Sequence, residues 1–183
     1  VNEIAKLPNV EAVTPFVRRN TILSTADGKQ HILIVLGVDP EHDRQVRGYE
    51  VTTGELSDKA GGIMLDEVFA AKAGVKVDQT VEFLTKLGWT KTKVVGLYKT
   101  KLTKRDADGE MLMPIRAAQH FFKTPRQIDA IQFVLKPGAD QDEARTAINS
   151  ILVGQVEFVE RKEEGSSEST TKKSPAQPAG SAK

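Results

Sequence analysis

Four side chains that commonly bind metal ions crowd into one short segment of the chain: Asp39, Glu41, His42 and Asp43. Carboxylate oxygens together with one imidazole could hold a hard divalent cation, and a metal-dependent hydrolase built on them is one hypothesis. Turns collect the same residue types, however, because these side chains hydrogen-bond to nearby backbone. We therefore interpret the segment as a solvated turn and expect no metal site.

A second acidic run, Asp-Ala-Asp-Gly-Glu at residues 106–110, is similar to the start of a calcium-binding loop. That loop needs glycine at its sixth position and glutamate at its twelfth. Here Met111 and Ala117 stand at those positions. We interpret the run as the tip of a polar loop.

The usual catalytic signatures are missing from the sequence. His31, His42 and His120 lie far apart, without the Ser or Asp pattern of a nucleophile elbow. Gly61-Gly62 lacks the Lys-Ser/Thr that completes a phosphate-binding loop. The chain has no cysteine, which excludes disulfides, thiolate chemistry and the common structural zinc sites. We expect no catalytic residue, no cofactor and no enzymatic activity.

A basic stretch is the remaining candidate site, as a contact for an anionic partner. It comprises Lys91, Lys93, Lys99, Lys101, Lys104 and Arg105. Two of these, Lys91 and Lys93, share one face of a predicted strand, because side chains alternate along strands. The competing interpretation is a solvated edge strand whose lysines discourage unwanted pairing. A nucleic acid partner is not expected, since only Trp89 and Tyr98 are near enough to stack on bases.

Composition is that of a globular domain. The 183 residues are 39% hydrophobic and 28% charged, with a net charge of +1. The longest apolar run, residues 32–36, is far shorter than the roughly 18 residues that cross a bilayer. Val1, Ile4 and Leu7 already follow helical spacing, so we expect an excerpt that begins within a helix.

Proline and glycine mark where the first elements should end. The opening helix should stop before Pro8, and an extended stretch follows over residues 10–17. Residues 21–25 and 30–36 then predict a hairpin, with a type I′ turn at Asp27-Gly28. After it, Pro40 should open a polar loop or short helix.

The later elements follow the same logic. Residues 63–65 predict a strand, and Asp66 and Gly74 should cap the two ends of the next helix. A second hairpin is expected over residues 77–84 and 91–98, with its turn at Leu87-Gly88-Trp89. Strand 111–113, a helix from Pro114 to near Phe122, strand 128–135, helix 140–152 and strand 155–160 complete the order. The hydrophilic segment 161–183 should be disordered, because it cannot bury enough surface to offset its ordering entropy.

The order of these elements resembles the extracytoplasmic core domain of FtsX-like ABC transporter permeases, the group that includes the MacB and LolC/LolE types. The resemblance covers residues 1–160 and rests on the order of six short signatures. They are Leu7-Pro8-Asn9-Val10, Gly37-Val38-Asp39-Pro40, Gly74-Val75-Lys76-Val77, Val94-Val95-Gly96, Met113-Pro114-Ile115-Arg116-Ala117-Ala118-Gln119 and Lys136-Pro137-Gly138-Ala139-Asp140. One departure is Asp78-Gln79, where the family often has Gly-Asp.

The resemblance implies an α+β fold in two parts. A porter-like part with a split βαβ arrangement would comprise residues 1–15 and 115–160. A β-rich, sabre-like part, residues 16–114, would be inserted between them. The tail 161–183 would follow the folded region.

The resemblance also implies a function. The domain would lie on the extracytoplasmic, or periplasmic, side of the inner membrane, held by flanking transmembrane helices in a permease dimer. A cytoplasmic ATPase subunit or domain would drive it, and it would pass that motion to substrate or to a periplasmic adaptor or lipoprotein. Efflux, lipoprotein release and control of cell-wall hydrolases are all open. The alternative is a stand-alone binding module that recognises an acidic ligand or anionic surface through residues 91–105.

Overall fold

The computed structural model describes residues 1–58, 61–99 and 107–152. The predicted strand 155–160 and the predicted disordered tail 161–183 lie outside these residues. Thirteen elements follow in order: α1 Asn2–Ala5, β1 Val10–Ser24, β2 Gln30–Val38, α2 Asp43–Arg47, β3 Glu50–Gly54, β4 Ile63–Asp66, α3 Glu67–Ala73, β5 Thr80–Thr85, β6 Gly88–Lys99, β7 Gly109–Pro114, α4 Ile115–Phe121, β8 Ala130–Leu135 and α5 Gln141–Ile151. A mixed sheet with peripheral helices confirms the predicted α+β class.

Six strands of the sheet close into a ring. The hydrogen-bonded order is β2-β7-β4-β6-β5-β1, and β1 also pairs with β2. Ring closure between β1 and β5 rests on two residue pairs, Leu23 with Phe83 and Ser24 with Glu82. β3 adds to β6, and β8 adds to the N-terminal half of β1. The ring satisfies backbone groups that an open sheet would leave unpaired.

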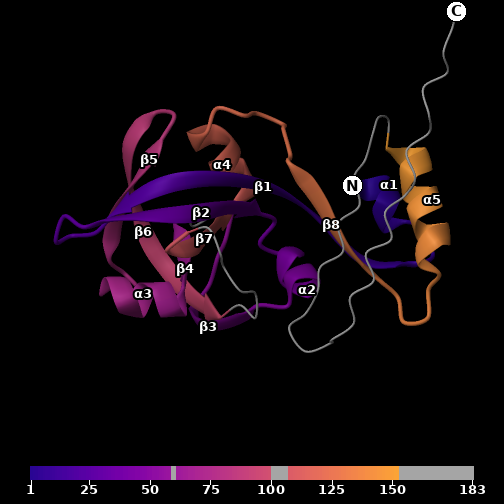
Figure 1. Ribbon diagram of the computed structural model, residues 1–183, viewed down its shortest axis with the longest axis horizontal. Helices are drawn as coiled ribbons and strands as arrows, with labels where there is room; N and C mark the ends of the chain where they lie inside the picture. Colours follow the sequence, from indigo (N-terminus) through magenta and orange to yellow (C-terminus); the bar gives the residue numbers. More distant parts are fainter. Residues whose placement is uncertain (59–60, 100–106, 153–183) are drawn as a thin grey trace, which may run out of the picture.

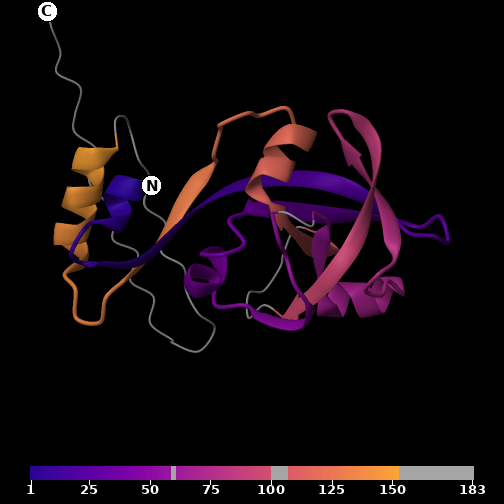
Figure 2. The same ribbon diagram turned by 180° about the vertical axis from the view of Figure 1, so that it is seen from behind.

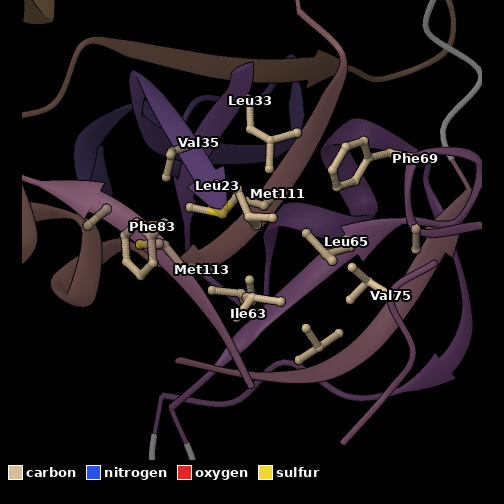
Figure 3. Close-up of a cluster of buried hydrophobic side chains, with 14 of the residues drawn as sticks. Leu23, Leu33, Val35, Ile63, Leu65, Phe69, Val75, Phe83, Met111 and Met113 are labelled. Atoms are coloured by element: carbon tan, nitrogen blue, oxygen red, sulfur yellow. The ribbon is translucent and has the colours of Figure 1, made fainter. Parts of the chain in front are cut away.

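Alternating apolar residues make two cores from the same strands. Inward-facing side chains of β2, β4 and β7 meet inside the ring (Figure 3), among them Val35, Leu65 and Met113. Their outward-facing neighbours form a second cluster with Tyr49 and Tyr98. Strands buried on both faces read as continuous apolar runs, which explains the sequence of residues 33–36, all of them buried.

The first and last described elements form a smaller unit, the chain-end unit, at one end of the molecule. Figures 1 and 2 both show α1 beside α5 there, with α3 and the β5–β6 hairpin at the other end. Ile4, Val10 and Ile148 are buried between the two helices, β1 and β8. β1 has 15 residues and therefore runs about 50 Å, from this unit into the ring.

The predicted domain boundaries remain a prediction. Elements α1, β8 and α5 pack together, as a porter-like part made from the chain ends would require. Helix α4, which the boundary at residue 115 assigns to the same part, instead places Ala118 and Phe122 in the ring's inner cluster. These contacts favour a boundary after α4.

Local signals located several elements well. Asp66 caps α3 by accepting a hydrogen bond from the backbone N–H of Phe69 at 3.0 Å, and Gly74 ends that helix in the left-handed conformation. α1 ends before Pro8, and Asp140 caps α5. Asp78, at the position where the family often has glycine, has a φ of 71°, a conformation that favours glycine.

Both predicted hairpins form, but their turns differ from the predictions. A type I′ turn needs positive φ at both central residues, whereas Gly28 has it and Asp27 does not. The N–H of Gly28 donates to the carbonyl of Thr25, and the N–H of Thr25 donates to the carbonyl of Lys29. The loop is therefore a three-residue type with a left-handed glycine. In the second hairpin Thr85 pairs with Gly88, so the turn is Lys86-Leu87.

Two strands were not predicted as they occur. Residues 10–17 and 21–25 belong to one continuous strand, β1, because β8 pairs with its first half and β2 with its second. The short strand β3 was missed altogether. Its burial pattern is almost entirely exposed, so its residues carry no apolar alternation from which a strand could be predicted.

The tyrosine pair of the outer cluster gives the first testable prediction. Tyr98 donates a hydrogen bond to Glu110 at 2.7 Å and packs edge-on against Tyr49, with ring centroids 5.3 Å apart. Burial raises the pKa of Tyr98 well above its ordinary value of 10.0, and the nearby charge of Glu110 raises it further. Burial, together with the smaller effect of the Asp43 charge, raises the pKa of Tyr49 to about 12.

We expect the free energy of unfolding to fall as pH rises above about 10, where tyrosines of the unfolded chain ionise. The folded state holds these protons more tightly, so the stabilisation is complete below that pH and is lost toward the folded-state pKa values. Urea unfolding of the wild type and of Tyr98→Phe across this range measures the slope. The slope should be shallower in the variant; equal slopes would show that Tyr98 does not contribute.

Candidate functional site

The acidic segment after β2 is only partly the solvated turn that its sequence predicts. Asp39 does lie at the surface and accepts hydrogen bonds from Glu41 N–H and the His42 ring, both at 3.0 Å. Asp43, by contrast, is fully buried, and its Oδ1 accepts a 2.8 Å bond from Nε of Arg47. The prediction of a solvated turn is wrong for Asp43, because it begins α2 and faces inward.

The same segment does not assemble a metal site in the described structure. Across residues 1–58, 61–99 and 107–152, no three His, Asp or Glu side chains come close enough to hold a metal ion. The buried carboxylate of Asp43 is directed at a cation that the chain itself supplies. The arrangement packs Asp43 and Arg47 together within α2 and orients the guanidinium.

The three histidines lie apart, in separate surroundings. His31 packs edge-on against Phe69, with ring centroids 5.3 Å apart, and its Nδ1 is 3.9 Å from Asp108. His42 is exposed beside Asp39. His120 lies on α4 against Phe121. None of the three is brought to another histidine or to a serine–carboxylate pair by these contacts.

The part of the basic stretch that the structure describes lies along β6. Lys91 is 3.5 Å from Glu82, Lys93 is 2.8 Å from Asp78, and Lys99 is 3.6 Å from Glu67. All three lysines are mostly exposed, but each faces an acidic neighbour. Lys101, Lys104 and Arg105 lie outside the described residues, as does Asp106 of the acidic run.

Exposed apolar side chains lie beside the first two of these lysines. Leu84 and Trp89 pair across the β5–β6 hairpin, and Leu87 occupies its turn. Their exposed fractions are 37%, 47% and 49% in the order Leu84, Trp89, Leu87. Tyr98, the other aromatic residue considered for base stacking, is fully buried. One aromatic ring is therefore accessible on this strand.

A polar cluster around β1 and α2 could not be predicted from the sequence. The guanidinium of Arg47 lies over the ring of Phe16, 4.4 Å from its centroid. On the β8 side, Asp129 accepts hydrogen bonds from Arg18 N–H, at 2.6 Å, and from the Arg19 guanidinium. The i, i+4 spacing of Asp43 and Arg47 was the one available signal. The other partners are more than twenty residues apart in the sequence.

Comparison with solved structures shows the fold class. Over 82% of its length the chain matches 69% of the periplasmic region of MacB from Actinobacillus actinomycetemcomitans, with a TM-score of 0.63 and 17% identity. Over 80% it matches 74% of the extracellular domain of the noncanonic ABC-type transporter YknZ from Gram-positive bacteria, with a TM-score of 0.59 and 14% identity. The chain therefore shares the fold of these two domains. No curated protein sequence gives a significant match.

The family follows from the sequence itself. The model of the MacB-like periplasmic core domain matches residues 1–151, and the chain belongs to this family. The predicted resemblance is confirmed. The chain is thus a periplasmic or extracellular domain of a MacB/FtsX-like ABC transporter permease, a transport class rather than an enzyme class. Within the described residues, no helix is both long and apolar enough to cross a membrane.

Proposed function

We propose that this domain transmits ATP-driven motion across the inner membrane and engages substrate or a periplasmic partner in efflux or lipoprotein release. Its immediate partners are the flanking transmembrane helices and a cytoplasmic ATPase subunit or domain, and the permease works as a dimer. An adaptor or lipoprotein is the candidate partner on the periplasmic side. These roles extend what family membership shows.

One observation supports transmission above the others. α1 and α5, the first and last described elements, contact each other at one end of the molecule (Figure 1). In this family the domain is held by membrane helices at its two ends, so both attachments would act on this end. β1 continues without a break from here into the ring. A displacement at the attached end is therefore carried outward along a continuous hydrogen-bonded strand.

The ring suits the receiving end of such a movement. Its inner cluster is closed on all sides by paired strands, with α3 and α4 against it. Packed cores of this kind shift as units rather than deform continuously. Motion that enters through β1 would accordingly move the whole ring.

Restraining the ring tests this proposal in the full permease reconstituted with its ATPase. A peptide epitope inserted at Gly28, in the exposed turn between β1 and β2, lets a bivalent antibody tie the two domains of a dimer together. We expect ATP hydrolysis to slow several-fold with the bivalent antibody. Its monovalent fragment, which binds the same epitope, should leave the rate unchanged. Equal rates with both would contradict transmission.

A second candidate function has a specific observation in its favour. Trp89, Lys91 and Lys93 alternate along β6 and are all exposed, a combination that a stand-alone module could use to bind an acidic ligand or anionic surface through residues 91–105. The ion pairs of Lys91 and Lys93 with Glu82 and Asp78 weigh against it, because they already neutralise the lysines.

Vesicle sedimentation separates this candidate from the first. Vesicles containing anionic phospholipid should not pull down the chain if the lysines are satisfied internally. Binding at low salt that decreases with added salt, and that Lys91→Glu with Lys93→Glu abolishes, would instead support the binding module. Zwitterionic vesicles serve as the control for non-specific adsorption.

A further inference from the structure

β1 changes partners at Phe16. Residues on its N-terminal side pair with β8, those on its C-terminal side pair with β2, and Phe16 itself pairs with both Ala130 and Val38. The unit at the chain ends is joined to the ring at this position. A long strand that crosses between two separately packed cores would bend there unless something holds it.

Helix α2 lies against this crossing and contacts both β1 and β8 (Figure 1). Its Arg47 is nearly buried, with 9% of the side chain exposed, and its guanidinium covers the Phe16 ring at 4.4 Å. The fully buried Asp43 fixes that guanidinium from the preceding helical turn, through the 2.8 Å bond to Nε. Gly48, with a φ of 63°, ends the helix immediately after Arg47.

The backbone on the β8 side is held by a different group. Asp129 N–H donates to the carbonyl of Phe16 at 2.9 Å, and its carboxylate accepts from Arg18 N–H and the Arg19 guanidinium. The backbone of Phe16 is thus hydrogen-bonded to the segment before β8, while its aromatic side chain is covered by Arg47 of α2. Two independent polar contacts meet at one residue of one strand.

Buried ion pairs are weak contributors to stability, because desolvation offsets their attraction. Such a pair does fix the direction of the guanidinium, because a planar group that is bonded to a buried carboxylate is restricted to one arrangement. A cation over an aromatic ring is likewise sensitive to position, and Phe16 packs, partly buried, against the second cluster. The cluster is therefore better suited to holding an angle between two parts than to holding the fold together.

We infer that Asp43, Arg47 and Asp129 clamp β1 at Phe16, so that the chain-end unit and the ring move as one rigid body. These are positioning residues, and their role rests on the proposed function because rigid coupling is what passes motion outward. The clamp is a property of this chain alone, however, and can be measured without any ATPase.

Spin labels measure the angle directly, because the chain contains no cysteine and takes labels only where cysteines are introduced. Lys72→Cys on α3 and Asn149→Cys on α5 place labels at exposed helical positions at opposite ends of the molecule. In the otherwise unchanged chain, the distance distribution between them should be narrow. We expect it to widen roughly twofold in Arg47→Ala, as a released hinge allows.

Phe16→Leu provides a second variant should Arg47→Ala fail to fold. It removes the aromatic side chain beneath the guanidinium and keeps an apolar residue in β1. It should widen the distribution while the far-ultraviolet circular dichroism stays unchanged. Lys91→Ala, which breaks an exposed ion pair within the ring, should leave the distribution narrow. A distribution already broad in the wild type, or one that neither Arg47→Ala nor Phe16→Leu changes, would overturn the clamp. Neither result bears on whether nucleotide moves the domain.

Discussion

Replacing Phe83 by alanine should lower the free energy of unfolding by about 3–5 kcal/mol, the cost typical of emptying an aromatic site in a packed core. Phe83 is fully buried and pairs across strands with Leu23, which is also fully buried, in one of two pairs that close the ring between β5 and β1. Phe121 packs edge-on against it, at 5.4 Å between centroids. Urea unfolding followed by circular dichroism measures the change.

Leu84→Ala is the matched control, because Leu84 is the next residue of β5 and points outward, 37% exposed. Its loss should cost less than about 1 kcal/mol, as is usual for surface positions. If both substitutions cost the same, β5 would not have the inward and outward faces that closure of the ring requires. The comparison therefore tests ring closure as well as stability.

Enlarging Gly37 should be the next most damaging change. A Cβ at this position would lie 2.4 Å from Cβ of Ala118 and 3.4 Å from Cβ of Val17, closer to Ala118 than real contacts allow. Glycine here lets α4 lie directly on β2. We expect Gly37→Ala to destabilise by about 1–3 kcal/mol, the range typical of overpacking, and Gly37→Val by more.

A compensating variant shows whether this contact is the cause. Ala118→Gly removes the methyl that Gly37→Ala would meet, although glycine in a helix itself costs about 1 kcal/mol. The double variant should be more stable than the sum of the two single changes predicts, as coupled neighbours are. Strict additivity would place the damage of Gly37→Ala elsewhere than at α4.

The elements that could be predicted from sequence are those whose signals are local. Asp66 and Gly74 specify the ends of α3 by themselves, because a side-chain cap and a left-handed glycine act within one helical turn. The Gly37 signature is a different case. Its position could be recognised, but its reason could not, because Ala118 approaches it from a helix about eighty residues later.

Long-range pairing explains what could not be predicted. The sequence predicts two strands where the structure has the single strand β1, because polar residues such as Arg18 and Arg19 interrupt the apolar pattern. In the structure those residues are paired by β2 and bonded to Asp129, which no local pattern reveals. Ring closure likewise depends on register between distant strands, and the parallel pairs β2–β7 and β4–β6 arise only in the folded chain.

The candidate site followed the same division. Alternation along a predicted strand places Lys91 and Lys93 on one face, and both are exposed on β6. The burial of Asp43 could not be anticipated, since an acidic residue beside Asp39, Glu41 and His42 is ordinarily solvated. Asp43 is hydrogen-bonded to Arg47, whose guanidinium lies over the Phe16 ring, and only the fold brings this ring to α2.

The central claim is that nucleotide binding on the cytoplasmic side moves this domain outside the membrane. One label at Lys72→Cys in each permease of a dimer, reconstituted with its ATPase in lipid nanodiscs, reports the distance between the two rings. We expect the distance distribution measured with ADP to shift when a non-hydrolysable ATP analogue replaces it. Identical distributions in the two nucleotide states would contradict the claim, whatever the rigidity of the isolated chain.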